Sequence, residues 1–177
     1  MDRNSRIIII DADVVSHFIT GGEILNLTKI FSIPIKILDK VYAELERFKK
    51  RKTEVENLLN LKLIEVIPFP EENDEIRREY FNIKKLQFKG DGESACMAVA
   101  KFQKHVLASS NLKDIHQYCR LHGIDYLTTM DFLCEALRRG IFTEERCDQF
   151  ISAVLSAKSK LPVAKMRDYT CRKIDFI

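Results

Sequence analysis

The chain has 177 residues, of which 46% are hydrophobic and 31% charged, and its net charge at pH 7 is +3. This length is most simply one domain with a core of its own, and the composition is that of a globular protein. No apolar stretch approaches the roughly 20 residues needed to cross a bilayer. The start MDRNSR lacks the apolar region and cleavage site of a signal peptide. We therefore expect a cytoplasmic protein with no membrane partner.

Short apolar runs alternate with longer helical patterns along the chain. The first run, residues 7–10, holds four isoleucines without alternation, which is typical of a strand covered on both faces in a parallel sheet. Further strands are predicted at residues 34–38, 63–67, 106–109 and 125–128. Helices are predicted at residues 14–20, 23–30, 39–50, 54–60, 74–86, 91–103, 112–122, 130–139 and 143–157.

This alternation indicates βαβ units, in which right-handed crossovers place helices on both faces of a parallel sheet. The predicted fold class is α/β, a three-layer α/β/α sandwich with a central, mainly parallel sheet. We expect the main domain to cover residues 1–157. Residues 158–177 form a basic C-terminal extension, which holds Lys158, Lys160, Lys165, Arg167, Arg172 and Lys173.

The five cysteines are scattered, odd in number and without a CxxC pair; they are Cys96, Cys119, Cys134, Cys147 and Cys171. This pattern predicts reduced, mainly structural thiols in an intracellular protein.

Two carboxylates, Asp11 and Asp13, follow the first predicted strand. In open α/β sheets, ligands bind outside the carboxyl ends of the strands. Carboxylates at that position are well placed to hold a metal ion. The alternative is that one of them caps the helix that follows, since Asp is a favoured N-cap residue.

Glu44 lies in the helix predicted at residues 39–50, on or near the face that carries Val41, Leu45 and Phe48. A carboxylate that borders an apolar face costs free energy unless it is paired or bound to a cation. A metal-binding role and a solvent-exposed position at the edge of the helix both remain open for Glu44.

The segment Gly90-Asp91-Gly92-Glu93 places two acids around a glycine at a predicted helix start. Acids in a first helical turn complement the helix dipole. That explanation does not require the glycines, which open room for a ligand near the backbone. We therefore favour a site at Asp91 and Glu93.

Polar residues also follow the last two predicted strands. Asn111 could bind a hard cation through its amide oxygen, whereas Asp114 and Asp131 could equally cap the helices that follow. Carboxylate and amide oxygens suit Mg²⁺ or Mn²⁺ better than softer metals. Such ions activate a water molecule and stabilise charge at a phosphate undergoing in-line displacement.

The succession of IIIIDAD, VYAEL, GDGESACMAVA, LASSNLKD and GIDYLTTMDFL resembles the PIN domain family over residues 7–133. The resemblance implies a PIN-like nuclease domain, Mg²⁺- or Mn²⁺-dependent cleavage of RNA by a metal-activated water, an antitoxin as partner, and a homodimer. It implies metal-binding and catalytic roles for Asp11, Glu44, Asp91 and Glu93, with Asp13 as a near neighbour. The fourth acidic position falls on Asn111, where the chain departs from the family's pattern.

Basic residues offer candidate RNA contacts. Lys49, Lys50, Arg51 and Lys52 form one cluster and the C-terminal extension a second. Such clusters can follow a phosphate backbone, although a run of charges is often only a solvated face.

Two other functions remain open. An amide at position 111 supplies no negative charge, so the chain could be a catalytically impaired PIN-fold module that binds RNA or a protein. Haloacid-dehalogenase-like phosphohydrolases also carry a hhhhDxD motif, in which Asp11 would be the nucleophile and Asp13 the general acid. In that family the GDGxxD loop follows the strand that ends in Ser or Thr, whereas here GDGES precedes LASSN. The order favours the PIN interpretation.

Overall fold

A computed structural model of the chain describes residues 6–87 and 90–176, so most of the MDRNSR segment and the last residue of the expected extension lie outside it. Its strands form one five-stranded sheet of order β3-β2-β1-β4-β5, in which every neighbouring pair is parallel. All five predicted strands are confirmed, each to within two residues at either end. They are β1 (Ile8–Ile10), β2 (Ile35–Leu38), β3 (Glu65–Ile67), β4 (Val106–Ala108) and β5 (Tyr126–Leu127).

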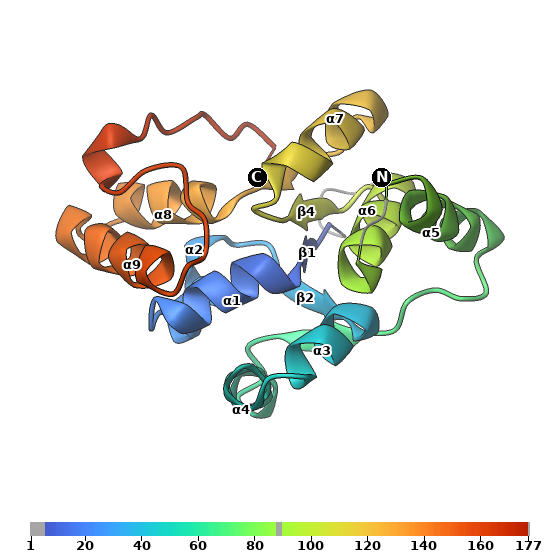
Figure 1. Cartoon of the computed structure of the whole chain (residues 1–177), viewed down its shortest axis with the longest axis horizontal. Helices are drawn as coiled ribbons and strands as arrows, with labels where there is room; N and C mark the ends of the chain where they lie inside the picture. The colour runs from blue at the N-terminus through green and yellow to red at the C-terminus, as the bar shows by residue number, and fades with distance from the viewer. Residues whose placement is uncertain (1–5, 88–89, 177) are drawn as a thin grey trace.

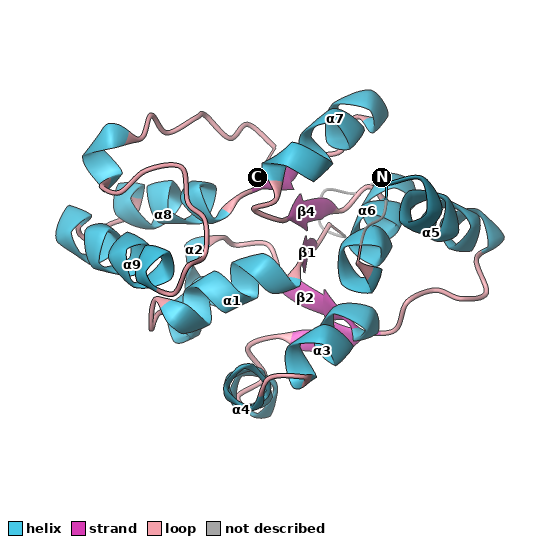
Figure 2. Ribbon diagram, in the orientation of Figure 1, coloured by secondary structure: helices cyan, strands magenta, loops and turns pink. Residues whose placement is uncertain are grey.

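Helices cover both faces of the sheet (Figures 1 and 2). One side carries α1 (Ala12–Thr20), α2 (Leu27–Ile30), α8 (Thr129–Arg138) and α9 (Glu144–Ser156), and the other carries α5 (Asp74–Gln87) and α6 (Asp91–Gln103). Toward the β3 edge lie α3 (Asp39–Glu46) and α4 (Lys49–Asn60), and toward the β5 edge lies α7 (Leu112–His122). The chain is thus an α/β protein with three layers, as predicted. No helix in the described part of the chain is long and apolar enough to cross a membrane.

Three predicted helices differ from the observed ones, and one of them is the helix predicted at residues 54–60, which begins five residues earlier as α4. The helix predicted at residues 39–50 ends at Glu46, and the chain extends at Phe48 (φ −119°, ψ 113°) before α4 begins at Lys49. The break lets α4 change direction and bury Val55 and Leu58 completely. The helix predicted at residues 23–30 is a 3-10 turn, η2 (Ile24–Asn26), followed by the short α2.

The centre of the sheet determines where a ligand would bind. All three residues of β1 are fully buried, with Ile8 opposite Ile35 of β2 and Val106 of β4. The chain leaves β1 toward β2 and β3, and later returns to the other side of β1 through β4 and β5. The carboxyl ends of β1 and β4 therefore border the switch point at which open α/β sheets bind ligands.

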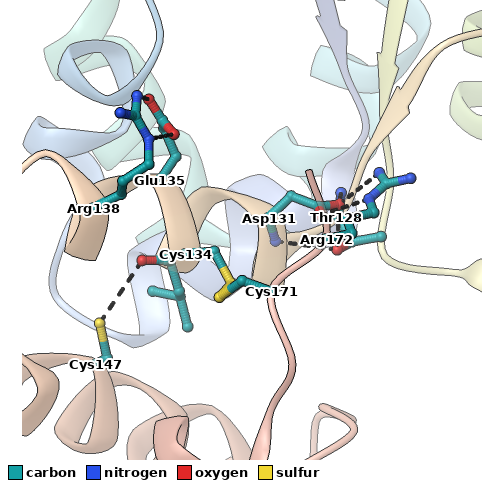
Figure 3. The surroundings of a disulfide bond; sticks show 9 residues. Thr128, Asp131, Cys134, Glu135, Arg138, Cys147, Cys171 and Arg172 are labelled. Atoms are coloured by element: carbon teal, nitrogen blue, oxygen red, sulfur yellow. Dashed lines mark hydrogen bonds and ion pairs between the residues drawn. A yellow bond between two sulfur atoms is a disulfide. The ribbon is translucent and has the colours of Figure 1, made fainter. Parts of the chain in front are cut away.

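The C-terminal segment returns across α8 and α9 toward β5 (Figure 1). It forms a second 3-10 turn, η3 (Met166–Asp168), and a disulfide joins its Cys171 to Cys134 of α8 (Figure 3). The prediction of reduced thiols is wrong for this pair, whereas Cys96, Cys119 and Cys147 are free and buried. The two paired cysteines are 37 residues apart, so only the packing of the segment, and no local spacing, brings them together.

Candidate active site

Asp11 follows β1 directly and is the N-cap residue of α1. Its Oδ1 accepts a hydrogen bond from the backbone N–H of Ala12 at 2.8 Å, and the hydroxyl of Ser109, which follows β4, lies 3.4 Å from its Oδ2. Only 6% of Asp11 is exposed. No Lys or Arg of the described residues forms an ion pair with its carboxylate. Asp11 thus caps a helix, as one interpretation expected, and also faces the switch point.

Asp13 is held by the loop that follows β4. Its Oδ2 accepts a hydrogen bond from the backbone N–H of Ser110 at 2.8 Å, and the Ser109 hydroxyl lies 3.4 Å from the same oxygen. Its Oδ1 accepts one from the N–H of Val14 at 2.6 Å. The ends of β1 and β4 are therefore joined through this carboxylate.

Glu44 of α3 reaches across to the start of α6. Its Oε1 accepts a hydrogen bond from the backbone N–H of Gly92 at 2.8 Å. A Cβ atom at Gly92 would lie 3.0 Å from Glu44 Oε2 and 3.1 Å from Val41 Cγ2. The space beside Gly92, which the sequence suggested was open for a ligand, is occupied by this carboxylate.

Glu93 and Asn111 lie together. The side-chain amide of Asn111 donates to Glu93 Oε1 at 3.2 Å, and its backbone N–H lies 3.4 Å from the Ser109 hydroxyl. Asn111 thus connects the loop after β4 to the first turn of α6. The structure brings together the loop after β4 and four of the predicted site residues, namely Asp11, Glu44, Glu93 and Asn111.

The carboxylates influence one another. Burial and the charge of Asp13 raise the pKa of Asp11 well above its usual range, and Glu93 and Glu44 raise it further. Burial also raises the pKa of Asp13, against the effect of the hydrogen bond from Ser110. Like charges in a poorly solvated place favour the protonated form, unless a positive charge compensates them.

Asp91 is separate from this group. Its Oδ1 accepts a hydrogen bond from the hydroxyl of Tyr80 at 2.7 Å and pairs with the ammonium group of Lys84, both on α5. The hydrogen bond from Lys84, followed by that from Tyr80, lowers the pKa of Asp91. Positions two apart on a helix point roughly 200° apart, which is why Asp91 and Glu93 face different neighbours.

The donor atoms of the group suit a hard divalent cation, because they are carboxylate and amide oxygens. Within residues 6–87 and 90–176, however, no three His, Cys, Asp or Glu side chains are placed to hold one metal ion in common. Glu44 is directed to the Gly92 N–H and Asp13 to the Ser110 N–H. The donor chemistry fits a cation, whereas the side chains as they lie do not surround one.

His17 is a buried polar residue that sequence reasoning missed. Its Nδ1 lies 2.8 Å from the Thr129 hydroxyl, which is 2.6 Å from the Ser110 hydroxyl, and its Nε2 lies 3.1 Å from the Ser159 hydroxyl. Burial, together with the charge of Arg51, lowers its pKa to about 4, so it is neutral at pH 7. His17 connects the loop that holds Asp13 to the C-terminal segment. No local pattern signals this role, because its partners are distant in sequence.

Asp131 has a different environment from the other strand-end acids (Figure 3). It forms a capping box with Thr128 at the start of α8, which confirms the capping interpretation. Arg172 of the C-terminal segment donates to both of its carboxylate oxygens, at 2.7 and 2.8 Å. The side chain of Asp114, the other acid considered for capping, lies outside those that the structure describes.

The basic cluster begins α4. Lys52 forms an ion pair with Glu46 at 3.0 Å, and the guanidinium carbon of Arg51 lies 4.4 Å from the centre of the Phe48 ring. Lys49 and Lys50 are exposed.

Comparisons with known proteins found similarity only to solved structures. No protein-family model matches the sequence, and no curated protein is significantly similar to it. Among solved structures, the chain is similar to the crystal structure of VapBC2 from Rickettsia felis bound to a DNA fragment from their promoter. The TM-score is 0.48 and the identity 17%, over 69% of this chain and 98% of the other. A match of this kind carries no information about individual side chains.

Proposed function

We propose that the chain is a PIN-like, metal-dependent ribonuclease. In this proposal Asp11, Glu44 and Glu93 hold Mg²⁺ or Mn²⁺, with Asp13 and Asn111 beside them. The observation that carries the proposal is the gathering of four carboxylates at the carboxyl ends of β1 and β4, where their charges and burial raise the pKa of Asp11.

A cation would supply the positive charge that the described residues do not provide at Asp11. Once bound, it would activate a water molecule and stabilise the charge that develops on a phosphate. Binding requires Glu44 or Glu93 to exchange a present hydrogen bond for the ion. Asp91 is left out of the proposed ligands, because Lys84 already neutralises its carboxylate.

The chain's own residues would orient the acids. The Ser110 N–H holds Asp13, and the Asn111 amide holds Glu93, so the loop after β4 sets the positions of two carboxylates. Because Asn111 is neutral, the site has one charge fewer than the PIN pattern implies. Weak cation affinity is the expected consequence.

The partners follow from the resemblance to PIN domains. We extend the proposal to RNA contacts at Lys49, Lys50, Arg51 and Lys52, to a protein partner of the antitoxin type, to a homodimer and to a cytoplasmic location. The exposure of Lys49 and Lys50 supports the first of these.

Cleavage of a fluorescent single-stranded RNA in Mn²⁺ tests the activity. We expect the double variant Asp11→Asn/Glu93→Gln to lose cleavage while its melting curve still shows one cooperative transition. Asp91→Asn is the matched control, because it removes a carboxylate from the same turn of α6 without touching the group, and it should still cleave. Unchanged cleavage in the double variant would contradict the proposal.

The presence of Asn111 favours a second candidate, a PIN-fold module that binds RNA or protein without cleaving it. Calorimetric titration with Mn²⁺ separates the two. Saturable binding that strengthens in Asn111→Asp supports the nuclease. Absence of saturable binding in the wild type, together with absence of cleavage, favours the binding module.

A further inference from the structure

Phe48 is an exposed aromatic residue between α3 and α4. More than half of its surface, 55%, is exposed, although the Arg51 guanidinium lies against its ring. Apolar surface left in water forgoes stabilisation of about 25 cal/mol per Å². The position of this ring is therefore not explained by packing.

The start of α4 also disregards the usual rules of helix stability. Phe48 occupies the N-cap position without a capping hydrogen bond, and the first turn holds Lys49, Lys50 and Arg51 with no acid. Both choices are unfavourable at a helix start, where a polar cap and negative charges are preferred. Local rules of this kind are most often broken where function requires it.

By comparison, α9 begins in the favourable way. Thr143 accepts a hydrogen bond from the backbone N–H of Arg146, and Glu144 and Glu145 fill the first turn. Because α2, α3 and α6 also begin without a side-chain cap, the basic first turn, more than the missing cap, distinguishes α4.

The charges beside Phe48 are unbalanced. Lys52 is paired with Glu46, but none of Arg47, Lys49 and Lys50 has an acidic partner among the described residues. A planar ring surrounded by unpaired cations complements a polyanion that also presents flat, unstacked rings. Single-stranded nucleic acid has that chemistry.

The cluster lies next to helices that carry members of the acidic group. Phe48 follows Glu44 by four residues, at the end of the helix that carries it. The charge of Arg51 reaches His17 of α1. His17 is six residues, or about 9 Å, along α1 from Asp11. Because α4 packs against both α1 and α3, the cluster lies on a helix that contacts the two helices carrying Asp11 and Glu44.

We propose that Phe48 and Arg51 form a stacking platform for an unpaired base, and that Lys49 and Lys50 bind the adjoining phosphates. The proposal rests on the proposed function for the choice of RNA, and it names the substrate class as single-stranded. A duplex keeps its bases stacked on one another and offers none to the ring.

Fluorescence anisotropy tests the platform in EDTA, where no divalent cation supports cleavage. The probes are a labelled 12-nucleotide oligoadenylate, an abasic oligomer of equal length and charge, and a blunt RNA duplex. The test variant is Phe48→Leu, which keeps an apolar side chain but removes the flat ring. The matched control is Phe81→Leu, because Phe81 on α5 is equally exposed at 57%.

We expect Phe48→Leu to weaken oligoadenylate binding about tenfold and to change abasic binding by less than about twofold. Phe81→Leu should bind both like the wild type, and the wild type should bind the duplex more weakly than oligoadenylate. Equal weakening for both single-stranded probes, an equal effect at Phe81, or preference for the duplex overturns the platform. So does failure of the wild type to bind any probe, a result that would favour a protein partner.

The outcome is independent of catalysis. In a protein that already carries Asp11→Asn, adding Phe48→Leu should still weaken oligoadenylate binding about tenfold, because Asp11 is not part of the platform. If cleavage is never observed but the Phe48 effect is, the platform stands and the nuclease proposal fails. If cleavage is observed without the Phe48 effect, the nuclease proposal stands and the platform fails.

Discussion

Asp11 and Asp131 are both buried acids at the carboxyl end of a strand, yet their surroundings are opposite. Asp131 is 1% exposed and accepts hydrogen bonds from Thr128 and from the Nε and Nη2 atoms of Arg172 (Figure 3). Asp11, 6% exposed, has Asp13, Glu44 and Glu93 as its charged neighbours.

The difference separates a structural acid from a candidate functional one. A buried charge is costly unless it is paired, and the chain provides the cation for Asp131 from its own C-terminal segment. At Asp11 the described residues add negative charge instead. Asp131 therefore stabilises the fold, whereas the group around Asp11 suits a cation from solution.

The largest expected effect comes from releasing the segment that carries Arg172. Replacing Cys171 with Ser should lower the free energy of unfolding by about 3–4 kcal/mol, because the disulfide closes a loop of 37 residues in the unfolded chain. Urea denaturation measures the loss, and a reducing agent should reproduce it in the wild type. Cys147→Ser is the control that keeps the disulfide, so the reducing agent should lower its stability as it does that of the wild type, whereas Cys171→Ser should not respond to the reducing agent. Equal stability of oxidised and reduced wild type would contradict the expectation.

Breaking the ion pair between Arg172 and Asp131 should have the next largest effect on stability. Arg172→Ala leaves the Asp131 carboxylate buried and unpaired, which we expect to cost about 2–4 kcal/mol, reduced by the partial exposure of Arg172. The double variant Arg172→Ala/Asp131→Asn should recover part of this loss, since no charge remains to be paired. A double variant as unstable as the sum of its single variants would show that the two residues do not interact.

Removing the carboxylate of Asp11 is expected to increase the stability of the fold at pH 7, whereas breaking the Asp131 ion pair decreases it. Because the pKa of Asp11 is raised in the folded state, the protonated form favours folding, and stability is lost as pH rises from about 4 through the raised pKa. Asp11→Asn should therefore melt higher than the wild type at pH 7, by roughly 2–4 °C for each kcal/mol gained, and the difference should shrink toward pH 4. Mn²⁺ should raise the melting temperature of the wild type but not that of Asp11→Asn. A lower melting temperature for Asp11→Asn at pH 7 without metal would oppose this account.

The smallest effect is expected at Asp91. Its carboxylate is half-exposed and paired with Lys84 at the surface, where ion pairs contribute little. Asp91→Asn should change the melting temperature slightly and leave the Mn²⁺-induced rise intact. Loss of that rise would show that Asp91 takes part in binding the metal ion.

The strands could be predicted because their signal is local. Residues 7–10 are apolar without alternation, and a strand covered on both faces needs that composition. The break between α3 and α4 was predicted at residues 51–53 but lies at residues 47–48, because the helical pattern continues through Phe48 and only the burial of Val55 and Leu58 requires the earlier turn.

The candidate site was partly predictable for a similar reason. Strand-end acids and the order of the segments point to Asp11, Glu44 and Glu93. The separation of Asp91 from Glu93 depends on where α5 places Tyr80 and Lys84, and the role of His17 depends on Thr129 and Ser159. These contacts are made across the fold and leave no spacing in the sequence.

The sequence by itself determined the α/β class, the parallel sheet and the placing of acids at the ends of its strands, because hydrophobic periodicity and the succession of strands and helices along the chain can be read from the residues directly. The tertiary structure decided which acids are compensated. Arg172, brought back by a disulfide-tied segment, neutralises Asp131, and Lys84 neutralises Asp91. Asp11 is left among like charges, since charge compensation depends on distance in space and the chain's order does not encode it.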